Sequence, residues 1–350
     1  MNIRTVICLC LCLAGSRGLL AQSAETPPMG FNVVECLPQS DTICAVPFAR
    51  APVFQGVVLS SSEAGGQVTL TPEGDPAWTI NEYQTLYFVR VLSGAKAGMY
   101  YQVAANASGT VTMDLAGDSA TGFDAGVTFR IHPFWTLSTL FPAGTQTTLV
   151  TSTGTLANQR RSLILLPNVN GVGTNIAPLE TYYVLSSGWR KTTGEFSDNV
   201  ILFPDSYFII RHNHATITAS TFYTPAGNVE LNAVTSPLAT RSGGQQDNFV
   251  SSGRPIPVKV KDLDLISSGA FLASTSTLNN GRRDLLLVFD NSVPGINKAP
   301  VKSYYYYSGT WRKIGGTADD GDDIIEPSQG LIIRKYQNAS NATYFWTNTF

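Results

Sequence analysis

Charged residues are scarce in this sequence, and their scarcity excludes several classes of protein. Asp, Glu, Lys and Arg make up 14% of the 350 residues, against roughly 25% in an average soluble domain. The formal net charge is -2, and the chain has no block of Lys or Arg. Because nucleic acids select a basic stripe on their partners, we expect no nucleic-acid partner. Plentiful Gly, Ser, Thr and Asn are typical of a β-rich extracellular protein.

Long apolar runs are missing as well. The main run covers residues 5–14, about half of the roughly 20 residues that a membrane-spanning helix needs. It follows the basic Arg4 and precedes Ala21, a pattern that predicts a secretory signal peptide over residues 1–21, cleaved before Gln22. The mature chain then has no transmembrane helix. We expect an exported protein that is periplasmic, cell-surface or extracellular.

Cysteine is nearly absent from the mature chain. Three of the five cysteines lie in the signal peptide, which leaves Cys36 and Cys44. An even pair in an oxidising compartment predicts a disulfide between them, closing a short loop around Pro38. Two buried free thiols are the alternative. Two Cys without a neighbouring His supply too few ligands for a zinc site.

No segment of the mature chain shows a convincing helical period. Residues 22–135 instead contain short β-branched and aromatic runs bounded by Gly, Asn, Pro or Ser, such as 85–91 and 109–114. This spacing predicts an N-terminal β domain, either a β-sandwich or a small barrel. The stretch Ser93–Gly98 predicts a glycine-flanked hairpin, because a strand follows it and a phosphate-binding loop would need a helix there.

The most informative feature is a duplication. Residues 157–191 recur at 279–313, so that Trp311 follows Trp189 by 122 residues. A repeat of this kind predicts two copies of one structural unit, and we place them at 136–228 and 258–350. The Gly-rich, polar segment 229–257 between them is predicted to be a linker. The fold class is therefore all-β, with an N-terminal domain followed by two homologous β units.

Aromatic residues of the repeat are the strongest candidates for ligand binding. They are Tyr183, Trp189, Tyr305 and Trp311. Exposed Tyr and Trp side chains can stack on sugars or anchor a protein interface, and packing in the core is the alternative for Trp189 and Trp311.

Other candidate sites are weaker. Asp319, Asp320, Asp322 and Asp323 form the densest charge in the chain; a solvated turn and a calcium loop both suit such a cluster. His212 and His214, two residues apart on a predicted strand, are expected to face solvent. No nucleophile, acid–base or cofactor-binding set is recognisable, so we expect no enzyme activity and no cofactor.

Several motifs carry a resemblance. Together with the signal peptide, residues 93–98, 132–137 and 240–247 resemble a family of uncharacterised secreted bacterial proteins with a β-rich composition. The resemblance implies export and an all-β build, and it implies no activity or catalytic residue.

These observations predict an exported structural or adhesive protein of the bacterial envelope or exterior. The alternative function is carbohydrate binding, with Trp189 and Trp311 as platforms. The sequence does not choose between a protein and a glycan partner, and it leaves a homo-oligomer open.

Overall fold

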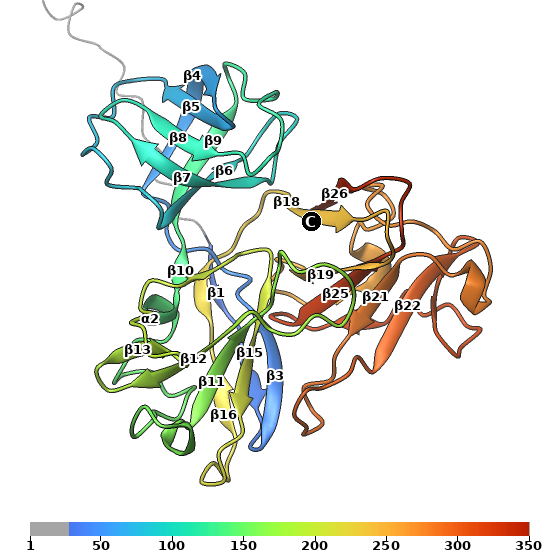
Figure 1. Ribbon diagram of the computed structural model, residues 1–350. Coiled ribbons are helices and arrows are strands. Elements are labelled where there is room, and N and C mark those ends of the chain that lie inside the picture. Colours follow the sequence, from blue (N-terminus) through green and yellow to red (C-terminus); the bar gives the residue numbers. More distant parts are fainter. Residues whose placement is uncertain (1–27, 350) are drawn as a thin grey trace, which may run out of the picture.

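The computed structural model describes residues 28–349, which are almost entirely strands and loops. The all-β prediction is confirmed. Figure 1 shows a barrel above a first sheet-containing unit, with a second such unit beside it. Within the described residues, no helix has the length and apolar character needed to cross a membrane. The predicted signal peptide lies outside the described residues.

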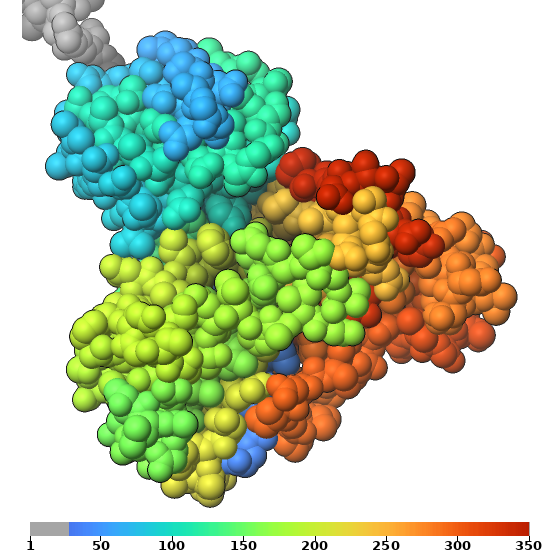
Figure 2. Space-filling model, in the orientation of Figure 1, coloured from blue at the N-terminus to red at the C-terminus, as the bar shows by residue number. Residues whose placement is uncertain are grey.

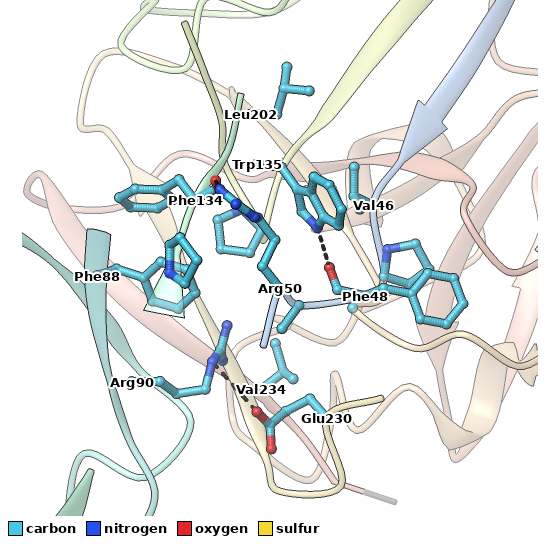
Figure 3. A pocket seen from close by; sticks show the side chains of 15 residues that line it. Val46, Phe48, Arg50, Phe88, Arg90, Phe134, Trp135, Leu202, Glu230 and Val234 are labelled. Atoms are coloured by element: carbon cyan, nitrogen blue, oxygen red, sulfur yellow. Dashed lines mark hydrogen bonds and ion pairs between the residues drawn. The ribbon is translucent and has the colours of Figure 1, made fainter. Parts of the chain in front are cut away.

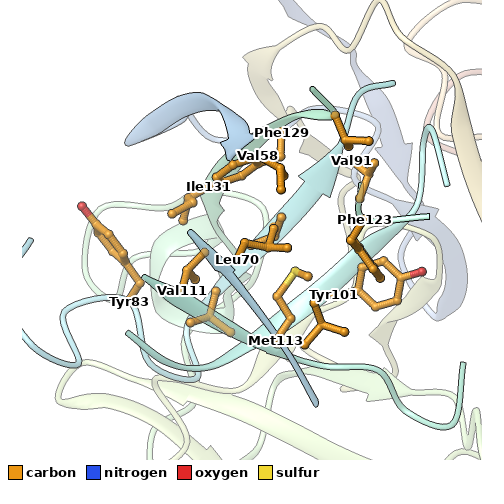
Figure 4. Close-up of a cluster of buried hydrophobic side chains, with 14 of the residues drawn as sticks. Val58, Leu70, Tyr83, Val91, Tyr101, Val111, Met113, Phe123, Phe129 and Ile131 are labelled. Atoms are coloured by element: carbon orange, nitrogen blue, oxygen red, sulfur yellow. The ribbon is translucent and has the colours of Figure 1, made fainter. Parts of the chain in front are cut away.

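A closed six-stranded antiparallel barrel forms the upper body. Its strands, in sheet order, are β4 (Phe54–Ala64), β5 (Gln67–Pro72), β8 (Val111–Asp114), β7 (Tyr100–Asn106), β6 (Tyr87–Val91) and β9 (Thr128–Pro133). Alternate residues of each strand point inward, as in β5, where Val68 and Leu70 are buried. Val111, Met113 and Phe129 join them in the barrel core (Figure 4). Of the two forms predicted, the barrel is the one observed.

The first unit is built on a five-stranded antiparallel sheet. Its order is β13 (Gly188–Lys191), β12 (Glu180–Leu185), β11 (Ser162–Leu166), β15 (Tyr207–His212) and β3 (Ser40–Ala45). Three short ribbons flank the sheet: β1 (Met29–Phe31) with β17 (Ala226–Asn228), β2 (Val34–Cys36) with β16 (Thr221–Tyr223), and β10 (Trp135–Thr136) with β14 (Ile201–Leu202). The helix α2 (Leu137–Leu140) and the 3₁₀ turn η1 (Ala157–Gln159) complete it.

The second unit repeats this plan. Its sheet order is β23 (Thr310–Lys313), β22 (Lys302–Tyr307), β21 (Leu285–Val288), β25 (Gly330–Lys335) and β19 (Gln246–Ser251). Ribbons of β18 (Val234–Thr240) with β26 (Ala342–Asn348) and of β20 (Val258–Lys259) with β24 (Ile324–Ile325) flank it, along with the 3₁₀ turns η2 (Val260–Asp262) and η3 (Asn279–Gly281). Ile164 pairs with Tyr182 in the first unit as Leu286 pairs with Tyr304 in the second. The predicted repeat is therefore present in the strand register.

The structure corrects the predicted boundaries. Strand β3 belongs to the first unit, so the predicted N-terminal domain at 22–135 combines a piece of that unit with the barrel. The barrel is inserted between β3 and β10, at the place where the second unit runs directly from β19 to β20. Nor is 229–257 a linker, because it carries β18 and β19 and buries Phe249 and Val250.

A charged contact joins the loop of one unit to the sheet of the other. In the first unit the Arg211 guanidinium donates from Nε to Asp41 Oδ1 at 2.6 Å and from Nη2 to Oδ2 at 2.7 Å. Asn297, from the second unit, donates its backbone N–H to the same Asp41 Oδ2 at 2.7 Å. Its side-chain oxygen accepts from Arg211 Nη2 at 2.6 Å. The Asp41 carboxylate is buried and satisfied from both units.

The same contact occurs in reverse. Arg334 donates to Asp247 at 2.6 and 2.9 Å within the second unit. Asn175, from the first unit, donates its backbone N–H to Asp247 at 2.7 Å and accepts from Arg334 at 3.0 Å. Asn175 and its counterpart Asn297 both have a φ of 54°, a left-handed conformation that Asn tolerates better than most residues. The two units are thus related by a pseudo-two-fold axis.

Apolar side chains fill the space between the two sheets. Ile43, Tyr207, Phe249, Leu287, Phe289 and Ile332 form one buried cluster drawn from both units. Tyr207 and Phe249 meet edge to face at 5.7 Å between ring centroids. Apolar burial therefore supplies stabilising free energy at this interface, while the two charged contacts set its register.

Removing either buried carboxylate tests this interface. We expect Asp247→Ala to lower the free energy of unfolding by about 3 kcal/mol, because Arg334 is left without its partner in a partly buried site. Urea denaturation followed by tryptophan fluorescence measures the loss. Asp322→Ala, which removes an exposed carboxylate paired with Lys259, is the control and should change little. Equal unfolding midpoints for the two variants would contradict the assignment.

Candidate functional site

The four aromatic candidates of the repeat are buried. Trp189 is 0% exposed and Trp311 is 4% exposed, while Tyr183 and Tyr305 are also enclosed. The indole of Trp189 donates to the carbonyl of Phe141 at 3.0 Å. None of the four can stack on a sugar, so the platform hypothesis is wrong for these residues and core packing is correct. The reason is that each sheet is covered on both faces, so neighbouring tyrosines are buried together.

The carboxylates of the acidic loop 319–323 are already bonded to lysines, to a tyrosine and to the backbone. Asp322 pairs with Lys259 at 2.7 Å and Asp320 pairs with Lys313 at 2.8 Å. Asp323 accepts from the Tyr304 hydroxyl at 2.5 Å, and Asp319 accepts from the backbone of Gly321. Across residues 28–349, no group of three or more His, Cys, Asp or Glu is arranged to hold a metal. The loop is therefore stabilised by internal contacts.

The predicted disulfide is not formed. Cys36 and Cys44 are free, buried thiols, which is the alternative that the sequence left open. Both belong to the apolar core of the first unit, alongside Phe208 and Tyr223. A hydrogen bond with Cys44 lowers the pKa of the Cys36 thiol, and burial raises the pKa of Cys44.

The histidines hold structural positions. His212 lies in the core with one ring nitrogen 2.8 Å from Ser162 Oγ and the other 2.8 Å from Thr221 Oγ1, so the expectation that it faces solvent is wrong. His214 lies beyond the end of β15, against Arg161. His132 stacks on Phe88 at 5.4 Å. Burial lowers the pKa of both His132 and His212 to about 4.

A groove between the barrel and the two units is the best candidate for a binding site. We call it the interbody groove. Its volume is about 510 Å³, within the usual range for ligand sites. It is lined by Met99–Gln102 and Asp114–Asp118 of the barrel, Phe203 and Asp205 of the first unit, and Thr235, Pro237, Thr343 and Phe345 of the second. Figure 2 shows the blue-green barrel beside the gold and red surface of β18 and β26.

The predicted hairpin at Ser93–Gly98 joins the barrel to the second unit. Thr235 on β18 donates its N–H to the carbonyl of Gly98 at 3.1 Å and its hydroxyl to that of Ala97 at 3.0 Å. Gly98 has a φ of +87°, and a Cβ added there would lie 2.7 Å from the carbonyl oxygen of Ala233. Only glycine suits both this conformation and this close approach.

A tyrosine–aspartate hydrogen bond joins the barrel to the first unit. Tyr100 on β7 donates to Asp205 Oδ1 at 2.7 Å, and burial raises the pKa of both groups. The carbonyl of Asp205 also accepts from Ser251 of the second unit at 3.1 Å. At the pseudo-symmetric position stands Ser328, whose carbonyl accepts from Ala45 at 2.9 Å. The two units therefore differ at this position, and the carboxylate of Asp205 is the group that binds the inserted barrel.

Polar and aromatic groups meet in the groove. Asp118 accepts from the Tyr101 hydroxyl at 2.6 Å and from the buried Lys96 ammonium at 2.5 Å. Phe203 and Phe345 line the groove while remaining 41% and 37% exposed. The groove thus offers carboxylate acceptors beside accessible apolar rings. Nothing in the sequence pairs Tyr100 with Asp205, which lies 105 residues away, so sequence reasoning missed this site.

A small cavity lies where the three bodies meet (Figure 3). Its volume of about 30 Å³ suits one or two water molecules and no larger ligand. Arg90 from the barrel approaches Glu230 at 3.9 Å and donates to the carbonyl of Gly98 at 3.0 Å. Both charged side chains are buried. This cavity is a structural junction, and the larger groove is the candidate site.

Adding a methyl group at Gly98 tests how the groove is built. We expect Gly98→Ala to push the hairpin away from Ala233 and loosen the barrel from the second unit. Limited proteolysis should then cut the connections near residues 50 and 134 faster than in the unmodified chain. Gly117→Ala is the control, because an added Cβ meets nothing there although φ is also positive. Equal cleavage rates for the two variants would refute the proposed docking.

The buried histidines predict a pH dependence of stability. Because the folded pKa of about 4 lies below the ordinary value near 6.5, the unfolded chain binds more protons between these values. Stability is therefore complete above about pH 6.5 and falls as the pH drops toward 4, by up to roughly 3 kcal/mol per histidine. Urea unfolding at several pH values measures it. His212→Gln should flatten the profile, and an unchanged slope would contradict this cause.

Comparison with known proteins gives no further guide. No protein-family model, curated protein or solved structure matches this chain. Its function is therefore inferred from the interbody groove and from the contacts that hold the three bodies together.

Proposed function

We propose that this protein is an exported structural or adhesive component of the bacterial envelope or exterior, that it has no catalytic activity, and that it binds its partner in the interbody groove. One observation carries the proposal: buried polar contacts lock three β bodies into a single shape, and the groove between them presents accessible aromatic rings.

The use of the polar residues supports a binding role. His132 and His212 are buried in structural hydrogen bonds, Asp205 holds Tyr100, and Glu230 faces Arg90 in the junction cavity. These groups are the ones that catalysis would otherwise use. Phe203 and Phe345 lack such a structural role at their exposed edges, and rings of this kind act as anchors in binding surfaces.

Carbohydrate is the second candidate ligand. It is favoured by the carboxylate of Asp118 lying in the same groove as the rings of Phe203 and Phe345. Acceptors and apolar faces side by side match the hydroxyls and the apolar ring faces of a sugar. In this proposal the rings that stack on the sugar are Phe203 and Phe345 of the groove, in place of the predicted Trp189 and Trp311.

Two phenylalanine variants test the proposal. We expect Phe203→Ala and Phe345→Ala to weaken binding of the purified protein to isolated envelopes of the producing cells by roughly tenfold each, because each removes an apolar anchor. Phe222→Ala removes an exposed ring on β16, outside the groove, and should bind normally. A glycan array with the same variants separates sugar from protein ligands. Full binding by both groove variants would contradict the proposal.

A further inference from the structure

A lysine and an aspartate form a buried pair inside the second unit. Asp284 precedes β21 and Lys335 ends β25; Leu285 and Arg334 are paired across these strands, so the next positions face each other. Asp284 is 0% exposed and Lys335 is 3% exposed. The Nζ of Lys335 is in direct contact with Asp284 Oδ2 and with the carbonyl oxygen of Ala270.

Backbone donors hold the carboxyl group. Asp284 Oδ2 accepts from the N–H of Leu272 at 2.7 Å, and Oδ1 accepts from the N–H of Tyr336 at 2.7 Å. The ring of Tyr344 lies 4.8 Å from the Lys335 nitrogen. The amine and the carboxyl carbon are therefore held together in an enclosed site, with each carboxyl oxygen bound by an amide.

The first unit has a different pair at the same place. Ser162 and His212 occupy the matching positions of β11 and β15, where they are paired across the strands and joined by a 2.8 Å hydrogen bond. In this pair each buried polar side chain is hydrogen-bonded to the other, and no buried ion pair is needed. The second unit instead buries an amine against a carboxyl group, which is costly for an ordinary ion pair.

We propose that Lys335 and Asp284 condense into an intramolecular isopeptide bond. The ammonium first passes a proton to the carboxylate, which gives a neutral amine and a carboxylic acid. The amine nitrogen then attacks the carboxyl carbon: a C–N bond forms, the C–OH bond breaks, and the hydroxyl group leaves as water with a proton from the nitrogen. The reaction needs no oxidant, reductant or cofactor.

The surroundings favour each part of this reaction. Burial raises the pKa of Asp284, so the neutral acid is accessible in the folded protein. Contact between the reacting groups removes most of the entropic cost of bringing them together. Lys335 contacts Oδ2, so this oxygen takes the proton and leaves as water, while Oδ1 becomes the oxyanion of the tetrahedral intermediate. The N–H of Tyr336, bound to Oδ1, can stabilise that oxyanion. The enclosed site also keeps out the water that hydrolysis of the product would need.

The bond would staple β25 to β21 and close residues 284–335 into a covalent ring. The strand that follows β25, β26, pairs with β18 beside the barrel, so a pulling force on the chain would meet the cross-link before it could strip β25 from the sheet. Such a cross-link would be the covalent bond that the free thiols of Cys36 and Cys44 do not supply. The inference goes beyond the proposed function and does not depend on it.

Mass spectrometry of the full mature chain tests the proposal. We expect the intact, denatured protein to be lighter than its sequence by one water molecule. Trypsin should release peptide 284–298 joined to peptide 335–350, because the modified Lys335 is no longer a cleavage site. An intact mass equal to that of the sequence, with a free peptide 336–350, would overturn the proposal.

Variants locate the bond. Lys335→Arg keeps a cation but cannot form this amide, and Asp284→Ala removes the carboxyl group, so both should show the full sequence mass. Lys313→Arg alters a lysine paired with Asp320 on the surface and should keep the mass deficit. The unmodified protein alone decides the question if either variant fails to fold. A deficit that persists in Asp284→Ala would place the lost water elsewhere and overturn the assignment.

Discussion

The structure depends on two buried carboxylates that each need both repeat units. Asp41 and Asp247 receive a guanidinium from their own sheet and a backbone N–H from an asparagine loop of the other unit. Separating the units would strip each carboxylate of that amide donor and expose the apolar cluster around Tyr207 and Phe249. Since unpaired buried polar groups are costly, the two copies behave as one body.

This paired body explains how the chain tolerates an inserted barrel. The insertion occurs between β3 and β10, at one end of the first unit, where the second unit has a short connection. The barrel then gains its own contacts, with Gly98 against β18 and Tyr100 on Asp205. The groove exists because the inserted barrel lies beside the pseudo-symmetric pair of units. Asp205, which binds Tyr100 of the barrel, stands where the second unit has Ser328.

The features that the sequence predicted correctly are those that depend on local residue patterns. Alternating β-branched runs predicted the all-β class, and the constant spacing of 122 residues predicted the repeat, because paired strands and turns in both copies keep the same lengths. The sequence did not reveal that β3 belongs to the first unit. Asp41 and its counterpart Asp247 are not 122 residues apart, and the residues of β3 and β19 around them differ. The sequence also did not show that both sheet faces are covered, which buries Trp189 and Trp311. The groove and the Lys335–Asp284 pair were missed because their members meet only in three dimensions.

Amide hydrogen exchange in the unmodified protein tests the central claim most directly. The backbone N–H groups of Asn175 and Asn297 lie in loops, yet each donates to a buried carboxylate of the other unit. If these contacts join the units, both amides will exchange as slowly as those of β11 and β21, because they open only when the interface does. Exchange at the rate of exposed loop amides, while the sheets stay protected, would contradict the account.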